Sequence, residues 1–155
     1  MNEPSSNASP ETPARQARRL MVDANRAVLA TLLGGWPYAS LVLPALDDKG
    51  APLLLLSDLA EHAKNLKADA RCSLLYDGTA GLADPLTGPR VTVLGEAHPI
   101  QDKDLLARFV ARHPSAGLYA GFGDFRLYRI TIARAHLVAG FGEIHWIEGG
   151  ALLES

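Results

Sequence analysis

Short apolar runs separated by tight turns are the feature of this chain that most restricts its fold. Residues 27–33 (AVLATLL) are apolar, and the turn sequence GGWP leads from them to residues 38–46 (YASLVLPAL). The four-residue connection DDKG then leads to residues 52–57 (PLLLLS). Parallel strands need crossovers of about a dozen residues, whereas antiparallel strands are joined by short turns. These three runs therefore predict antiparallel β-hairpins.

The rest of the chain adds strands and helices. Amphipathic spacing predicts helices over residues 13–26, about 60–68 and 102–114. Further strands are predicted over 71–78, 89–100 and 125–140, and Gly95 indicates a bulge in the second of these. Six strands with helices confined to three connections do not alternate as βαβ units do. The predicted fold class is mainly β (α+β): an antiparallel barrel decorated by helices.

Composition limits the class of protein further. The 155 residues suffice for one domain, predicted over 14–155, after a disordered tail over 1–13 that is rich in Ser, Pro, Asn and Glu. The net charge of −2, with signs interspersed, argues against a nucleic-acid partner. No apolar run approaches the roughly 18 residues that cross a membrane, and the tail lacks the hydrophobic stretch of a secretory signal. With Cys72 as the single cysteine, we expect a cytoplasmic protein.

Polar side chains gather where the third strand runs into a helix, in LLLLSDLAEHAKNL (53–66). Ser57, His62, Lys64 and Asn65 all carry hydrogen-bond donors, and the start of a helix adds free backbone N–H groups that favour an anion. The segment therefore predicts a phosphate site. The alternative is that Ser57 or Asp58 caps the helix while His62 and Lys64 face solvent.

Other residues are weaker candidates. Arg90 begins an apolar strand, where it could reach a ligand or serve as an exposed strand-end charge. Trp36, Tyr38 and Trp146 could flank a planar ring or pack at the rim of the core.

Several familiar sites are excluded by spacing. The five histidines form neither HxH nor HExxH, which argues against a dedicated metal site. The serine in LSDLA lacks the GxSxG pattern of a nucleophile elbow. Neither GFGDFR nor GFGEIH completes GxGxxG.

Two longer segments, YASLVLPALDDKGAPLLLLSDLAEHAKNLKADARCSLLYDG and DPLTGPRVTVLGEA, resemble the pyridoxamine 5′-phosphate oxidase-like, FMN-binding split-barrel superfamily. The chain is most similar to its haem-utilisation and general-stress-like branch, from about Ala17 to Ile147. The resemblance implies a six-stranded antiparallel split barrel with flanking helices. It also implies a homodimer that binds FMN in grooves between the subunits and acts as an oxidoreductase on an unknown small molecule.

The resemblance also implies which residues hold the cofactor. The segment containing Ser57, His62, Lys64 and Asn65 corresponds to the phosphate site. The strand carrying Ala39, Ser40, Leu41 and Val42 corresponds to the strand beside the isoalloxazine, and Arg90 to a polar position facing the flavin ring.

The sequence departs from the oxidases at the second strand. Their R-x-V-L-L-K pattern is replaced by A-S-L-V-L-P, so Ala39 and Pro44 stand where two basic residues are expected. Pyridoxamine phosphate is therefore not the expected substrate. Two alternatives follow: a haem-binding protein that uses the same groove, with His145 as a candidate iron ligand, or a dimeric binding module without a cofactor.

Overall fold

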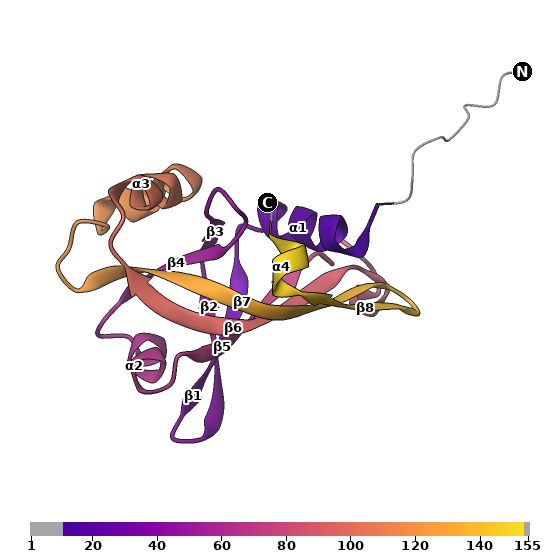
Figure 1. The fold of residues 1–155 in the computed structure, drawn as a ribbon, viewed down its shortest axis with the longest axis horizontal. Helices are drawn as coiled ribbons and strands as arrows, with labels where there is room; N and C mark the ends of the chain where they lie inside the picture. Colours follow the sequence, from indigo (N-terminus) through magenta and orange to yellow (C-terminus); the bar gives the residue numbers. More distant parts are fainter. Residues whose placement is uncertain (1–10, 154–155) are drawn as a thin grey trace, which may run out of the picture.

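The fold is one strongly curved antiparallel sheet with helices at its edges and ends (Figure 1). The computed structural model describes residues 11–153. Its strands are ordered β2-β1-β5-β6-β7-β4-β3, and β8 pairs with β7. The strands are β1 (Ala27–Leu33), β2 (Trp36–Val42), β3 (Pro44–Leu46), β4 (Pro52–Ser57), β5 (Arg71–Asp77), β6 (Arg90–Ile100), β7 (Phe125–Gly140) and β8 (Glu143–Glu148). The helices are α1 (Pro13–Asp23), α2 (Glu61–Ala68), α3 (Lys103–Arg112) and α4 (Gly149–Leu152), with 3-10 turns η1 (Pro85–Thr87) and η2 (Pro114–Leu118).

The predicted split-barrel class is confirmed, but the described residues form eight strands instead of six. The run 38–46 divides at Leu43, so that β2 pairs with β1 whereas β3 pairs with β4. Pro44 lies at this division, and proline cannot donate a hydrogen bond to a sheet. The closing segment adds β8, which the sequence left unassigned.

The predicted helices 13–26, 60–68 and 102–114 correspond to α1, α2 and α3, whereas α4 was not predicted. Thr12 caps α1 by accepting a hydrogen bond from the Arg15 backbone N–H, and Pro13 is its first residue. Asp102 caps α3 in the same way. Thr12 and Pro13 therefore belong to the folded part of the chain, and the rest of the predicted tail, apart from Glu11, lies outside the described residues.

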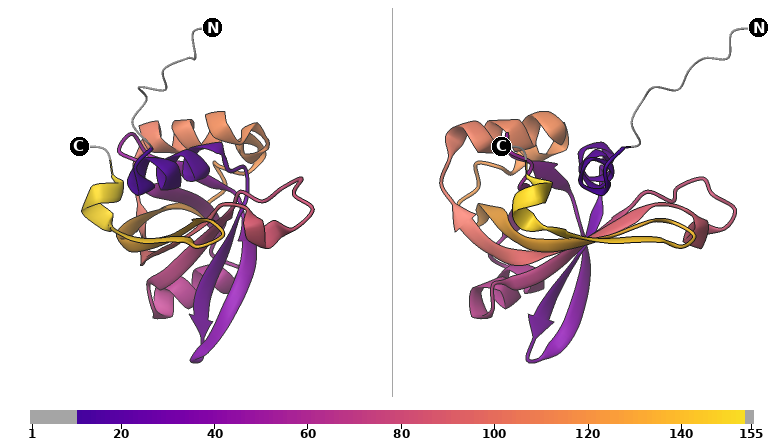
Figure 2. Two further views of the ribbon diagram at one scale, coloured as in Figure 1. Left: turned by 90° about the vertical axis from the view of Figure 1, so that its right-hand side faces the viewer. Right: turned by 45° about the vertical axis from the view of Figure 1, so that its right-hand side comes forward.

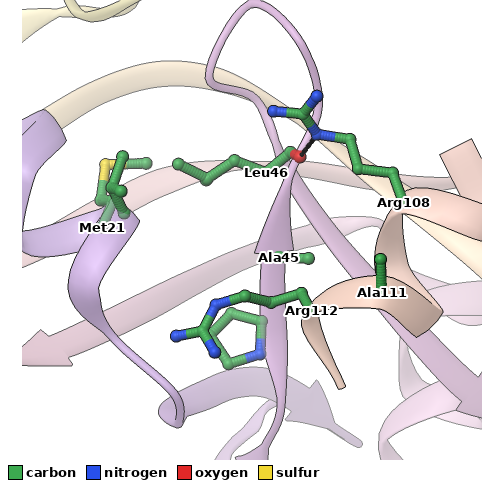
Figure 3. A pocket seen from close by; sticks show the side chains of 8 residues that line it. Met21, Ala45, Leu46, Arg108, Ala111 and Arg112 are labelled. Carbon is green, nitrogen blue, oxygen red and sulfur yellow. Dashed lines mark hydrogen bonds between the residues drawn. The ribbon is translucent and has the colours of Figure 1, made fainter. Parts of the chain in front are cut away.

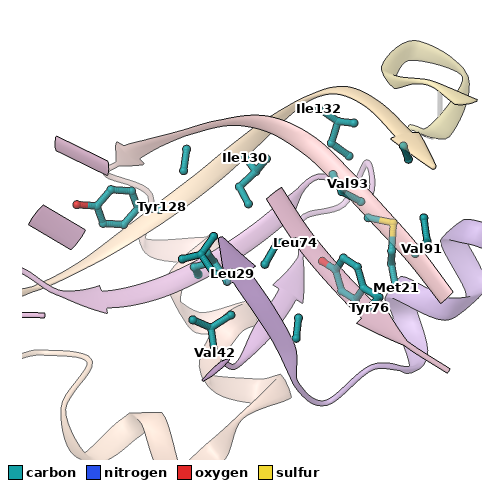
Figure 4. Packing of buried hydrophobic residues seen from close by; sticks show 14 of the residues in the cluster. Met21, Leu29, Val42, Leu74, Tyr76, Val91, Val93, Tyr128, Ile130 and Ile132 are labelled. Carbon is teal, nitrogen blue, oxygen red and sulfur yellow. The ribbon is translucent and has the colours of Figure 1, made fainter. Parts of the chain in front are cut away.

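The core lies on the inner face of the sheet. Alternate residues of β1, β5 and β6, such as Leu29, Leu74 and Val93, are buried there with Ala17 and Met21 of α1. Figure 4 shows Leu29, Leu74 and Val93 converging from three strands, with Met21 of α1 beside them. A smaller cluster, centred on Phe109, lies beneath α3. Because side chains alternate along a strand, burying one set turns the intervening set outward.

One end of the sheet extends beyond the core. The hairpin formed by β7 and β8 projects beside the loop that precedes β6 (Figure 2). Phe141, at the hairpin tip, is 91% exposed. The outward face of the sheet therefore continues along this arm.

Candidate functional site

The end of β4 holds Ser57 in a network with Asp124. The Ser57 hydroxyl donates a hydrogen bond to Asp124 Oδ2 over 2.9 Å, and the backbone N–H of Asp58 donates to the Asp124 carbonyl over 2.7 Å. The Leu59 backbone N–H donates to Ser57 Oγ over 3.2 Å. Ser57 thus already donates its proton to a carboxylate, and an anion placed there would face the negative charge of Asp124.

Helix α2 separates the other three predicted phosphate ligands. Asn65 is buried, and its Nδ2 donates to Oγ1 of the buried Thr31 over 3.1 Å. Lys64 is exposed to solvent. Residue Ala60 occupies the N-cap position and makes no side-chain cap, so the alternative in which Ser57 or Asp58 caps α2 is wrong. The structure therefore does not bring Ser57, Lys64 and Asn65 together as one donor cluster.

His62 lies in a different environment from its neighbours. Its imidazole is partly buried, and burial lowers the pKa of His62 below its usual value. Its Nδ1 is buried and has no hydrogen-bond partner among the described residues. It lines a cavity of about 290 Å³ together with Leu41, Val42, Phe109 and Tyr119. A largely neutral imidazole in apolar surroundings is a weak phosphate ligand.

Strand β2 sends its four candidate residues to opposite faces of the sheet. Ser40 faces inward, where its hydroxyl lies 3.5 Å from the Leu29 carbonyl, and Val42 is buried. Ala39 is exposed and Leu41 is 69% exposed. Because strand side chains alternate, only Ala39 and Leu41 are available on the outward side.

A continuous row of side chains crosses the outward side of the sheet. Residues directly opposite each other in an antiparallel pair lie on the same face. The strand registers therefore place one residue from each of six strands in a line. In order from β2 to β8, these residues are Leu41, Val28, Leu75, Thr92, His136 and Trp146. We call this set the outer row, and the side of the sheet that carries it the outer face. Leu41, Leu75 and Trp146 are 69%, 39% and 54% exposed, so the outer face presents apolar surface to solvent.

A cationic and aromatic cluster occupies one end of the outer row. The rings of His136 and Trp146 have centroids 4.4 Å apart, and the Arg134 guanidinium carbon lies 4.2 Å from the Trp146 ring centroid. No group among the described residues forms a hydrogen bond with the ring nitrogens of His136. This imidazole can therefore accept a ligand.

Sequence reasoning missed this cluster. Its local signal is the alternation of Arg134, His136 and Val138 with the buried Ala135 and Leu137. Pairing with Trp146 depends on β8, whose existence and register emerge only from the fold.

Arg90 joins the outer face at its strand end. It pairs across the sheet with Asp77 and Val138. Its Nη1 donates to the carbonyls of Leu86 and Gly88, over 3.0 and 3.2 Å. These bonds anchor the guanidinium to the loop before β6 and leave its other N–H groups available.

A hollow of about 690 Å³ opens on the outer face at the opposite end of the row from Trp146. Val28, Leu41 and Leu75 line it together with the end of α1 and the loop after β5. Its size lies within the usual range of roughly 300–1,000 Å³ for small-molecule sites.

His145 does not join His136. It pairs with the buried Leu137, so it lies on the opposite face from Trp146, and its Nε2 is 3.4 Å from a Glu143 carboxylate oxygen. No group of three or more metal-ligating side chains occurs among residues 11–153. Within the same range, no helix is long and apolar enough to cross a membrane.

Comparison with known proteins agrees with this architecture. A family model described as "CREG, beta-barrel" matches residues 8–152. The chain belongs to the CREG β-barrel family. Its resemblance to the split-barrel proteins of the pyridoxamine 5′-phosphate oxidase and haem-utilisation type is thereby confirmed.

Individual relatives of this CREG-family chain differ in how closely they match. It is 38% identical over 109 residues to the atypical heme oxygenase HOZ, a chloroplastic protein of Arabidopsis thaliana. The aligned region covers 68% of this chain and 33% of that protein. A heme-binding protein from Mycobacterium smegmatis superposes with a TM-score of 0.86 at 32% identity, covering 93% of this chain and 61% of the other. The General Stress Protein 26 of Bacillus anthracis shares the fold alone, with a TM-score of 0.70 at 12% identity, covering 87% of this chain and 97% of the other.

Proposed function

We propose that this protein binds haem on the outer face, with His136 as the iron ligand. The observation that carries the proposal is the unpartnered imidazole of His136, set beside Trp146 and Arg134 on an apolar surface. The names of two relatives, a heme oxygenase and a heme-binding protein, point the same way. The chain spans 33% of the first protein and 61% of the second.

The chemistry of the outer face suits an anionic, flat macrocycle. A neutral imidazole nitrogen is a common iron ligand, Trp146 offers an aromatic surface, and Arg134 and Arg90 can pair with carboxylates. Bound haem would supply an iron centre for redox chemistry, which the protein would tune through the ligand and its surroundings. An oxidoreductase activity on a small molecule follows as part of the proposal.

We also propose that a second copy of the chain covers the outer face. The outer row crosses six strands and exposes Leu41, Leu75 and Trp146 along its length. Exposed apolar surface of this kind marks an interaction site. A two-fold dimer would bury the same face of both subunits and enclose the cofactor between them.

FMN is the second candidate ligand. The outer face would also accept a flat isoalloxazine, with Ala39 and Leu41 beside the ring and Arg90 near it. The phosphate fits less well, because Ser57 donates to Asp124 and Asn65 to Thr31, which leaves Lys64 as the exposed cation of that segment. A dimeric binding module without a cofactor is the third candidate. The cytoplasmic location stays a prediction.

Absorption spectroscopy during titration of the purified protein with haem, and separately with FMN, tests these candidates. We expect a saturable Soret shift with haem, and we expect His136→Ala to abolish that shift or weaken binding at least tenfold. His98→Ala removes an exposed histidine from β6 and should leave the titration unchanged.

Three outcomes would contradict the proposal. Loss of the shift in His145→Ala, with His136→Ala unaffected, would move the ligand to the opposite face of β8. Saturable binding of FMN without a haem response would favour the flavoprotein. If neither haem nor FMN changed the spectrum, the binding module without a cofactor would be the favoured function.

A further inference from the structure

We propose that a cavity between α1, β3 and α3 binds a small aliphatic carboxylate. In this assignment, Arg108 and Arg112 hold the carboxylate, and Met21 and Leu46 contact the chain. The site shares no residue with the outer face, so it does not depend on the haem proposal.

The cavity is built from three separate elements. It has a volume of about 350 Å³ and is lined from α1 by Met21 and Val22, from β3 by Ala45 and Leu46, and from α3 by the two arginines and Ala111. Figure 3 shows both arginine side chains leaving α3 on the side that faces β3, with Met21 approaching from α1. Arg108 and Arg112 are four residues apart, which places them on the same face of the helix.

Each guanidinium is oriented by one backbone carbonyl. Arg108 Nε donates to the Leu46 carbonyl over 2.7 Å, and an Arg112 Nη donates to the Ala24 carbonyl over 2.9 Å. A guanidinium carries five N–H groups, so most remain available for a ligand. No carboxylate among residues 11–153 forms an ion pair with either arginine. Two oriented cations without a counter-charge are complementary to a carboxylate.

The remainder of the lining is apolar. Met21 and Ala45 are buried in its floor, whereas Val22 is 58% exposed at its edge. A charged head with an aliphatic chain matches both parts of the cavity, whereas a bare anion would use only the arginines. The volume lies at the lower end of the range for small-molecule sites, roughly 300–1,000 Å³, so the ligand is a short chain and not a macrocycle.

Isothermal titration calorimetry of the full-length protein with octanoate tests this site. We expect saturable binding that Arg108→Gln/Arg112→Gln weakens at least tenfold. Octanol, which has the chain without the carboxylate, should bind at least tenfold more weakly than octanoate. Arg15→Gln removes an exposed arginine of α1 that does not line the cavity, and it should leave binding unchanged.

A second variant separates binding from folding, because both arginines also bond backbone carbonyls. Ala111→Glu places a carboxylate on the face of α3 that lines the cavity, at an exposed position next to Arg112 and three residues from Arg108, and it removes neither hydrogen bond. It should weaken octanoate binding at least tenfold while the urea midpoint is unchanged. Absence of saturable heat, equal affinity for octanol, or unchanged affinity in Ala111→Glu would overturn the proposal.

Discussion

Two buried side chains, Asn65 and Tyr76, and the half-buried His62 show how unevenly hydrogen bonds are satisfied in this barrel. Asn65 finds Thr31 across the core, over 3.1 Å. The Tyr76 hydroxyl and the Nδ1 atom of His62 have no partner among the described residues. A buried polar atom without a partner loses its hydration without compensation, which costs about 1–3 kcal/mol. Tyr76 and His62 are therefore the positions where a single substitution should be informative.

Removing the Tyr76 hydroxyl should not destabilise the protein. The side chain is fully buried, and burial raises the pKa of Tyr76, so the hydroxyl stays neutral. We expect Tyr76→Phe to leave the free energy of unfolding in urea unchanged or to raise it by about 1 kcal/mol. Tyr76→Leu, which also removes ring volume, should lower it. A loss of more than about 1 kcal/mol in Tyr76→Phe would reveal a partner for the hydroxyl.

His62 should make stability depend on pH. Its pKa is lowered in the folded state by burial, so below pH of about 6.5 the unfolded chain binds the proton more readily than the folded protein. The free energy of unfolding should therefore decrease as the pH falls from about 6.5 through the folded-state pKa. His62→Gln should reduce this slope in urea titrations between pH 7 and 5. The same slope in His62→Gln as in the wild type, with His98→Gln as the control, would assign the effect to other groups.

At the scale of elements, the close packing of β6 against β7 depends on Gly95. The strand register shifts between Leu94 and Gly95, which confirms the predicted bulge. A Cβ atom at residue 95 would collide with the Thr131 carbonyl oxygen and contact the Ile130 side chain. A side chain can be added here only if one strand moves.

We therefore expect Gly95→Ala to lower the free energy of unfolding by about 1–3 kcal/mol, the usual cost of overpacking. Gly121→Ala is the matched control, because a Cβ there meets nothing within 4 Å. Its effect should stay within about 0.5 kcal/mol. Equal effects of the two substitutions in urea denaturation would show that β6 and β7 can separate at the bulge.

At the scale of the whole molecule, the outer face is the surface that the single chain leaves open. Leu41 is 69% exposed at one end of the outer row, at the rim of the 690 Å³ hollow. We expect sedimentation velocity to show a dimer for the wild type and a monomer for Leu41→Glu at the same concentration, because dimerisation would bury the new charge.

Leu118→Glu is the control for this experiment. Leu118 is 81% exposed but lies in η2, outside the outer row, so its substitution should leave the dimer intact. A monomeric wild type, or a dimeric Leu41→Glu variant, would contradict the proposed interface.

Local pattern alone determined much of this protein. Apolar runs bounded by tight turns located most of the strands, and the spacing of apolar residues located α1, α2 and α3. Gly95 marked the bulge. Each of these signals is contained within a few neighbouring residues, so it can be detected without knowing what packs against them.

The tertiary structure decided the partners of the polar side chains. Ser57 donates to Asp124, 67 residues away, and Asn65 to Thr31, 34 residues away, which dispersed the predicted phosphate site. The division of residues 38–46 and the pairing of His136 with Trp146 likewise depend on which strands become neighbours. Strand register fixes which side chains share a face, and it is set by long-range packing of the whole sheet.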